Sequence, residues 1–297
     1  RDLSSMQVGQ CKYVILTNQH GGVLNDPILL RVEEDIYWFS LADSDILFWA
    51  QGLAANSDYD VEISEPDVSP LQLQGPKSRD IMVKIFGDEI LDLKYYWFKK
   101  FTHNGVELII SRTGWSSELG YEIFLTDSMY GNDLYNTIMD IGHPMGLKPG
   151  HTSTIRRIEG GMLSYHADMT INTNPLELGM DKFINLDQDF DFIGKEALIN
   201  ISNQGLSRKQ VGIIIEDNPM PGPNTRFWDV IKNGAVIGKV TSAVYSPRLK
   251  QNIGLAMVDI KYSDIGEELQ IDNGTMILDC KIVKKPFYDP NKSLTKS

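Results

Sequence analysis

The sequence lacks the features that mark several large classes of protein. No apolar run approaches the roughly 20 residues that a membrane-spanning helix needs. No charged-then-apolar leader with a small-residue cleavage site opens the chain. The two cysteines, Cys11 and Cys280, lie too far apart in sequence to suggest a disulfide framework or a metal-binding quartet. We therefore expect a cytoplasmic protein with reduced thiols and no metal site.

Basic charge is also scarce. The chain has 40 acidic and 28 basic side chains, which gives a net charge of -12. The densest basic points are the isolated pairs Lys99-Lys100, Arg156-Arg157 and Lys284-Lys285, which are typical of solvated surface. Such a chain repels a phosphate backbone. We expect neither a nucleic-acid nor a membrane partner, and the oligomeric state stays open, with a homodimer as one option.

Familiar cofactor motifs are missing as well. The sequence has no G-x-G-x-x-G after a strand, no G-x-x-x-x-G-K-[ST], no H-E-x-x-H and no C-x-x-C. The five histidines never stand four residues apart. These absences disfavour a nicotinamide-binding Rossmann site, a P-loop and a standard zinc site.

The first two thirds of the chain mix strand and helix patterns. Strands are predicted at 11–17, 28–32, 36–41, 68–74, 106–112 and 121–125. Helices are predicted at 42–55, where Asp43 and Ser44 suit the N-cap, and at 78–86, 133–141 and 154–163. This order of elements favours an α+β layer architecture.

The last third has a different texture. Short strand patterns recur at 212–216, 229–232, 235–241, 253–258, 268–271 and 275–283, and Asn233-Gly234 is a strong hairpin signal. This regular spacing predicts a compact β-barrel. We therefore divide the chain near Leu206, into a region 1–205 and a barrel domain 206–297. Since the first residue is Arg1 rather than Met, we expect a segment upstream of it.

One segment, Arg112 to Phe124, places an aromatic residue and a carboxylate around a glycine-punctuated turn. Gly114 and Gly120 can take backbone angles that other residues avoid. Strand alternation puts Glu122 and Phe124 on one face, and Tyr121, Ile123 and Leu125 on the other. A buried Glu122 would need donors, which the N–H edge of a flat heterocycle supplies. Alternatively, Glu122 is an exposed strand residue facing a Lys or Arg.

Two further charged residues stand next to glycine pairs. Asp26 follows Gly21-Gly22 and precedes Pro27, which restricts its backbone to extended geometry. Arg157 is predicted on a helix just before Gly160-Gly161, where another group can approach closely. Each also has a plain interpretation, as a turn aspartate and as an exposed helix arginine.

At these residues the sequence resembles the folate-dependent aminomethyltransferases, the superfamily of the glycine-cleavage T-protein. The resemblance extends over the whole chain and rests on many short pieces in the family's order. The pieces are Asp2-Leu-Ser, Gly22-Val-Leu-Asn-Asp26, Gln74-Gly-Pro-Lys-Ser78, Thr113-Gly-Trp, Gly120-Tyr-Glu122, Arg157-Ile-Glu-Gly160, Asp191-Phe-Ile-Gly-Lys195, Gly238-Lys-Val-Thr-Ser242, Ser246-Pro247 and Asn252-Ile-Gly-Leu-Ala256.

Within the superfamily, the details resemble the tetrahydrofolate-dependent dimethylsulfoniopropionate demethylases. Trp115, Asn25-Asp26-Pro27, Ser40-Leu-Ala-Asp-Ser-Asp45, Gly52-Leu-Ala and Leu163-Ser-Tyr165 follow that branch. The chain departs from it at Phe124, where the branch has a tyrosine. It departs again at Tyr165-His-Ala-Asp168, which replaces Y-G-N-D.

The resemblance implies a fold of folate-binding α/β domains followed by the barrel, and it assigns site residues. Glu122 would hold the pterin edge of tetrahydrofolate, with Tyr121 and Arg157 in the folate pocket. Asp26 would be catalytic, near the reacting nitrogens. The substrate side would be lined by Tyr13, Ser40, Trp115 and Phe124.

The activity this implies is transfer of a methyl group from a small donor, with dimethylsulfoniopropionate as first choice, to N5 of tetrahydrofolate. Three alternatives stay open on the same scaffold. They are aminomethyl transfer from a lipoylated carrier protein, O-demethylation of methoxylated aromatics, and a non-enzymatic folate-binding role in iron-sulfur protein maintenance. The last has a K-G-C-x-x-G-Q-E signature, where this chain has Phe192-Ile-Gly-Lys-Glu-Ala-Leu198.

Overall fold

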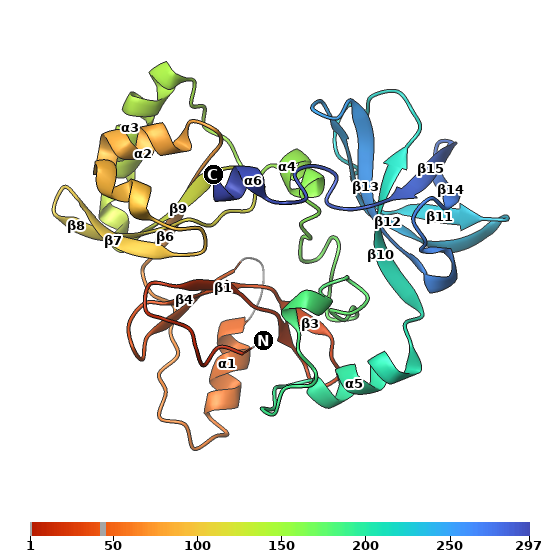
Figure 1. Cartoon of the computed structure of the whole chain (residues 1–297), viewed down its shortest axis with the longest axis horizontal. Helices are drawn as coiled ribbons and strands as arrows, with labels where there is room; N and C mark the ends of the chain where they lie inside the picture. Colours follow the sequence, from red (N-terminus) through yellow and green to blue (C-terminus); the bar gives the residue numbers. More distant parts are fainter. Residues whose placement is uncertain (1, 42–45) are drawn as a thin grey trace. The chain divides into compact units, whose positions relative to one another are not determined.

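The computed structural model describes residues 2–41 and 46–297 (Figure 1). The chain forms two compact units, and separate segments contribute to each. One, here called the barrel unit, contains Asp2, Val14–Asp26 and Ser153–Asn291. The other, the sheet unit, contains Leu3–Tyr13, Pro27–Thr152 and Lys292–Ser297.

The barrel unit is built on a closed antiparallel barrel with the strand order β10-β13-β12-β11-β14-β15 (Figure 1). The strands are β10 (Arg208–Ile215), β11 (Trp228–Lys232), β12 (Ala235–Ser246), β13 (Gln251–Asp259), β14 (Glu268–Asp272) and β15 (Ile277–Val283). Asn233 and Gly234, which connect β11 to β12, have φ angles of 52° and 78°. Positive angles at both central residues are those of a type I′ hairpin turn. The predicted barrel and hairpin are confirmed.

The rest of the barrel unit contains a short hairpin, two helices and much irregular chain. The hairpin pairs β2 (Leu16–Thr17) with β3 (Val23–Asn25), and the helices are α4 (Thr154–Glu159) and α5 (Lys195–Gln204). Helix α4 is shorter than predicted because Gly160 and Gly161 follow it, and Gly161 takes a left-handed φ of 64°.

The sheet unit is centred on a four-stranded antiparallel sheet with the order β6-β9-β8-β7. Its strands are β6 (Ser69–Gln74), β7 (Phe98–His103), β8 (Val106–Ser111) and β9 (Gly120–Leu125). Of these, β7 was not predicted from the sequence. Helices α2 (Ser78–Phe86) and α3 (Gly131–Gly142) cover one face, where Tyr121 and Ile123 pack against Met82 and Leu134 (Figure 1).

The opposite face of that sheet packs against a smaller sheet with the order β1-β4-β5. Its strands are β1 (Cys11–Tyr13), β4 (Ile28–Arg31) and β5 (Tyr37–Ser40), and α1 (Ile46–Ala54) follows them. Cys11 and Leu30 lie in one apolar cluster with Phe98, Ile109 and Phe124. Strand 11–17 was predicted as one strand, but the structure breaks it after Tyr13, where the chain passes from one unit to the other. The predicted caps Asp43 and Ser44 lie outside the described residues.

The unit is completed by the short helix α6 (Ser293–Lys296) near the end of the chain. Within residues 2–41 and 46–297, no helix combines the length and apolar character needed to span a membrane.

The thiols of Cys11 and Cys280 are buried and free, and burial raises the pKa of the Cys280 thiol to about 12.

Candidate active site

A polar row crosses the four-stranded sheet of the sheet unit. Glu122 on β9 lies directly opposite Gln72 on β6 and Ser111 on β8. Directly opposed residues share a face of the sheet, so the three side chains point the same way. Gln72 Nε2 donates a hydrogen bond of 2.7 Å to Glu122 Oε1, and the Thr113 hydroxyl donates to Oε2.

Glu122 is only 8% exposed. Burial raises its pKa above 4.5, and the hydrogen bonds from Thr113 and Gln72 oppose that shift. Within the described part of the chain, each carboxylate oxygen accepts one hydrogen bond from a neutral donor. An ionised carboxylate has about four acceptor positions. Glu122 therefore has acceptor capacity for the N–H groups of a ligand.

The turn after β8 closes over the side chain of Gln74. A Cβ atom on Gly114 or Gly120 would lie 2.4 Å or 2.3 Å from the Gln74 side chain. Gln74 Nε2 donates to the carbonyl of Tyr121 at 3.2 Å, and the Ser116 hydroxyl donates to Gln74 Oε1 at 2.5 Å. The two glycines therefore leave the space that the end of the Gln74 side chain occupies, a reason that the sequence did not suggest. Trp115 lies half-buried on this turn.

The structure brings together two of the predicted substrate residues. Tyr13 on β1 and Ser40 on β5 both pair with Ile28 on β4, so they flank it on one face of the smaller sheet. Cys11, two residues before Tyr13, shares that face and packs in the apolar cluster next to the Glu122 sheet. The charge of Glu122 contributes to raising the pKa of Cys11, after burial. Tyr13 and Ser40 therefore face the side of the sheet on which Glu122 lies.

Phe124 and Tyr121 are placed differently from each other. The Phe124 ring is buried in the apolar cluster between the two sheets, with its centroid 6.4 Å from that of Trp38. Tyr121 is 0% exposed on the opposite face, against the helices, and the Arg112 guanidinium carbon lies 5.3 Å from its ring centroid. The structure therefore separates the Tyr121 ring from Glu122, as alternation requires. The ligand roles of both residues stay predictions.

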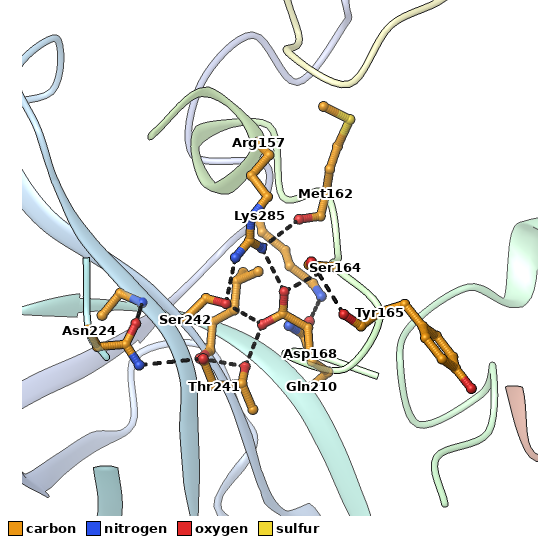
Figure 2. A network of polar contacts seen from close by, with 12 residues as sticks. Arg157, Met162, Ser164, Tyr165, Asp168, Gln210, Asn224, Thr241, Ser242 and Lys285 are labelled. Carbon is orange, nitrogen blue, oxygen red and sulfur yellow. Dashed lines mark hydrogen bonds and ion pairs between the residues drawn. The ribbon is translucent and has the colours of Figure 1, made fainter. Parts of the chain in front are cut away.

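In the barrel unit, Arg157 belongs to a buried polar network around Asp168 (Figure 2). From α4, Arg157 Nη1 donates to Asp168 Oδ2 at 2.6 Å, and Nη2 donates to Ser242 Oγ at 2.8 Å. The hydroxyls of Thr241 and Ser242 donate to Asp168 Oδ1 at 2.6 and 2.7 Å. Asp168 is 2% exposed. This guanidinium is held by protein groups, and a folate contact for it stays a prediction.

A β-bulge lets two successive residues of β12 reach the same carboxylate. The pairing of β12 with β13 passes from Val240 to Ser242, which leaves Thr241 as the extra residue. In a regular strand, neighbouring side chains point to opposite faces. The bulge re-aims them, so that both hydroxyls reach Asp168.

Lys285 lies in the same network and contacts the side-chain oxygen of Gln210 (Figure 2). Burial lowers the pKa of Lys285 to about 8, and the charge of Asp168 opposes that shift. A second cation therefore lies near the single Asp168 carboxylate.

Asp26 lies at the end of β3 and is half-buried. Its N–H donates to Asn25 Oδ1 at 2.8 Å. Burial raises the pKa of Tyr165, and the charge of Asp26 raises it further. The ring of Tyr165 contacts the His166 ring edge to face, with centroids 4.7 Å apart. The barrel unit therefore contains both Asp26 and Tyr165, and the Tyr165 hydroxyl donates to the carbonyl of Val23 on the strand that precedes Asp26.

Sequence reasoning missed several partners of the candidate residues. Gln72 and Thr113 hold Glu122, Gln74 supports the turn, and Asp168 holds Arg157. Gln74, Thr113 and Ser242 stood within motifs quoted for the resemblance, and Asp168 within a segment that departs from the demethylase pattern; none of the four had an assigned role. Gln72 gave no signal, because its partnership depends on strand register.

Two family models together cover most of the chain. The GCVT N-terminal domain matches residues 1–188, and the glycine cleavage T-protein C-terminal barrel domain matches residues 208–289. The chain belongs to the glycine cleavage T-protein family. The second match covers nearly the same residues as the strands of the closed barrel.

Individual relatives agree with this membership. A dimethylsulfoniopropionate demethylase, DmdA, from Ruegeria pomeroyi is 37% identical over 272 residues, which is 92% of this chain and 74% of the relative. An aminomethyltransferase from Alkaliphilus metalliredigens is 33% identical over 299 residues, 98% of this chain and 79% of the relative. The crystal structure of the glycine cleavage system aminomethyltransferase T from Bartonella henselae has the same fold. It matches with a TM-score of 0.86 at 21% identity, over 97% of this chain and 79% of that one.

Members of the T-protein family are folate-dependent enzymes of one-carbon transfer, so the predicted enzyme class, fold class and use of tetrahydrofolate are confirmed. The residues present also fit the group. Glu122 is a buried carboxylate whose described donors are neutral and which retains acceptor capacity. An N–H edge of a heterocycle would satisfy it.

Proposed function

We propose that this protein moves a methyl group from dimethylsulfoniopropionate to N5 of tetrahydrofolate. The observation that carries the folate half of this proposal is Glu122. Its carboxyl group is buried, and the described residues give it two neutral donors and no cation. Such a site is costly to the folded protein unless a ligand uses it.

In this proposal, Glu122 accepts hydrogen bonds from the pterin edge and fixes its orientation. Tetrahydrofolate, when bound, supplies the nitrogen that accepts the methyl group. The predicted folate residues Tyr121 and Arg157 then act through packing and through the Asp168 network, since both side chains are buried among protein groups.

The donor side needs little acid–base chemistry. A sulfonium methyl is already electrophilic, and the electron pair of the broken S–C bond stays on sulfur to leave a neutral thioether. The protein therefore mainly aligns the reactants and excludes water. Trp115 and Tyr13 would face the cation, a contact that contributes about 0.5 to 2 kcal/mol. Asp26 contributes a carboxylate charge and orientation beside the reacting atoms, and Ser40, next to Tyr13 across Ile28, completes the substrate side.

Two observations favour the sulfonium donor. The demethylase relative is 37% identical, compared with 33% for the aminomethyltransferase from Alkaliphilus metalliredigens. Trp115 and the Asn25-Asp26-Pro27 triplet also follow the demethylase pattern. The second candidate is aminomethyl transfer, which the match over 98% of the chain to that aminomethyltransferase supports.

The test is anaerobic incubation of the protein with tetrahydrofolate and a panel of donors. The panel contains dimethylsulfoniopropionate, an aminomethylated lipoyl carrier and a methoxylated aromatic acid. 5-Methyltetrahydrofolate is quantified for the two methyl donors, and 5,10-methylenetetrahydrofolate together with released ammonia is quantified for the lipoyl carrier. We expect the sulfonium donor to methylate tetrahydrofolate. We also expect the Glu122→Gln variant to need a higher concentration of tetrahydrofolate for the same rate. Folate binding without methylation from dimethylsulfoniopropionate would exclude this donor. Transfer from the lipoyl carrier would establish the second candidate.

A further inference from the structure

The predicted catalytic residue Asp26 follows a short strand, β3, that has little pairing with other strands. Strand β3 pairs only with the two-residue strand β2 among the described strands. A two-stranded ribbon this short is not stable by itself. Some other part of the barrel unit must therefore fix the position of Asp26.

That part is the chain from Ser164 to Thr173, here called the 164–173 segment. Val23 N–H donates to the carbonyl of Thr173 at 2.9 Å, and the Tyr165 hydroxyl donates to the carbonyl of Val23 at 3.2 Å. Both backbone polar groups of Val23 are thus bound by the same segment. A Cβ atom on Gly22 would lie 2.0 Å from the carbonyl oxygen of Ile171, so the two backbones are in direct contact.

The 164–173 segment has no regular secondary structure, and Asp168 gives it its shape. Ser164 N–H donates to Asp168 Oδ2 at 3.0 Å, while Asp168 N–H donates to the Ser164 carbonyl at 2.8 Å. The N–H of His166 donates to the carbonyl of Met169 at 2.9 Å. Figure 2 shows the Tyr165 ring pointing away from the Asp168 carboxylate. Asp168 therefore closes a turn whose tip carries Tyr165.

The same carboxylate ties this turn to rigid elements. Arg157 connects it to α4, and Thr241 and Ser242 connect it to the bulge in β12. Asp168 is buried and accepts bonds on both oxygens, which leaves the side chain one arrangement. Hydrogen bonds connect the barrel to Asp168 and Asp168 to the N–H of Ser164, and the next residue, Tyr165, donates to the carbonyl of Val23, three residues before Asp26.

We propose that Asp168 is a positioning residue for Asp26, acting through the 164–173 segment and the Tyr165 hydroxyl. This inference rests on the proposed function to the extent that Asp26 acts in methyl transfer. Asp168 itself touches neither donor nor acceptor. Through its hydrogen bonds to the barrel, it fixes the 164–173 segment, and that segment in turn holds β3 and so positions the Asp26 carboxylate.

The kinetic test uses full-length Asp168→Asn and Tyr165→Phe variants, with Asp229→Asn and Tyr262→Phe as matched controls elsewhere in the barrel unit. Because small displacements of a reacting group can reduce rates by about 100-fold, we expect kcat to fall about 10-fold for Tyr165→Phe and up to about 100-fold for Asp168→Asn. The dissociation constant of tetrahydrofolate should change by less than about 2-fold for Tyr165→Phe, since this substitution leaves both Glu122 and the Arg157–Asp168 pair in place. The controls should keep kcat.

A double-mutant comparison separates positioning from general damage. In an Asp26→Ala background, Tyr165→Phe and Asp168→Asn should reduce kcat no further, because the group they position is gone. The proposal would be overturned if Tyr165→Phe and Asp168→Asn lowered kcat by the same factor in the Asp26→Ala background as in wild type. Should Asp168→Asn fail to fold, Tyr165→Phe decides alone.

Hydrogen exchange gives a readout that needs no donor. In wild-type protein the amide of Val23 should be protected, and exchange in peptides spanning 22–26 should accelerate about 10-fold in both variants but not in the controls. Unchanged exchange in this stretch would contradict the proposal, even if the enzyme assay supports methyl transfer. If wild-type protein transferred no methyl group to tetrahydrofolate, that result would count against the proposed function. Hydrogen exchange in peptides 22–26 would then still decide the positioning role of Asp168.

Discussion

The two units of this protein each bury a carboxylate, and they surround it in opposite ways. In the barrel unit, Asp168 faces the Arg157 guanidinium and two hydroxyls, with hydrogen bonds to both oxygens. In the sheet unit, Glu122 faces the amide of Gln72 and the hydroxyl of Thr113, and burial raises its pKa. The first carboxylate is saturated by protein groups. The second is buried among described residues that include no cation partner, and it has acceptor capacity left.

This difference is the basis for proposing a structural role for Asp168 and a ligand-binding role for Glu122. A buried charge that is paired and fully hydrogen-bonded organises the fold around it. A buried charge whose desolvation is only partly offset destabilises the folded protein, and such groups concentrate at functional sites. By this comparison, we infer that Arg157 and Asp168 organise the barrel unit, and we propose that Glu122 binds the ligand. Substitutions in each unit can test that division.

The largest effect should come from removing the cation of the structural pair. Arg157→Met leaves Asp168 buried without its guanidinium, so the free energy of unfolding should fall by about 3 kcal/mol. Chemical denaturation measures this. The control is Lys239→Met, which breaks a half-exposed pair with Asp229 and should cost less than about 1 kcal/mol. Equal losses in the two variants would contradict a structural role for the Arg157 pair.

The second cation of that network should respond to pH. Below pH 8, Lys285 carries its proton in both the folded and the unfolded state. Between its folded pKa of about 8 and the ordinary 10.5, only the unfolded chain binds the proton, so stability should rise with pH by about 3 kcal/mol. Lys285→Met should lack this rise and be more stable near neutral pH. The measurement is the difference in unfolding free energy between wild type and variant, followed from pH 7 to 10.5. A difference that does not change with pH would contradict a lowered pKa for Lys285 in the folded protein.

Removing the Asp26 carboxylate should reduce turnover much more than it reduces the affinity for tetrahydrofolate. Because Asp26 is proposed to act on the reacting atoms, Asp26→Ala should lower kcat about 100-fold. The dissociation constant of tetrahydrofolate should stay within about 2-fold of wild type, since Glu122 supplies the anchor. Steady-state kinetics and equilibrium binding give the two numbers. Equal losses in both would remove the catalytic role.

Much of the fold followed from local patterns in the sequence. The Asn233-Gly234 signal, the evenly spaced strands of the barrel and the alternation along β9 all depend on neighbours in the chain, and the structure has them. Alternation along β9 is by itself enough to place Tyr121 and Glu122 on opposite faces. Strand β7 was not predicted, because Phe98–His103 mixes two lysines and a histidine with its apolar residues.

The partners within the site could not be predicted in the same way. Gln72 meets Glu122 only through the register of β6 against β9, and Thr241 and Ser242 reach one carboxylate only because β12 contains a bulge. Register and bulges arise from tertiary packing across tens of residues. The order of short family motifs located Thr241 and Ser242 but did not say what they contact, and no motif contained Gln72.

The most direct measurement is the affinity for tetrahydrofolate as a function of pH, in wild type and in Glu122→Gln. The ionised carboxylate accepts the ligand's N–H groups, so wild-type affinity should fall at least about 10-fold as pH decreases through the raised pKa of Glu122. Glu122→Gln should bind about 10-fold more weakly at neutral pH, with no such dependence. The variant should also unfold less readily at neutral pH. Because burial raises the pKa of Glu122, wild-type stability should fall as pH rises from 4.5 through the folded pKa, and the neutral amide of the variant avoids that loss. Equal affinity and equal pH dependence in the two proteins would contradict the central claim that Glu122 anchors the folate.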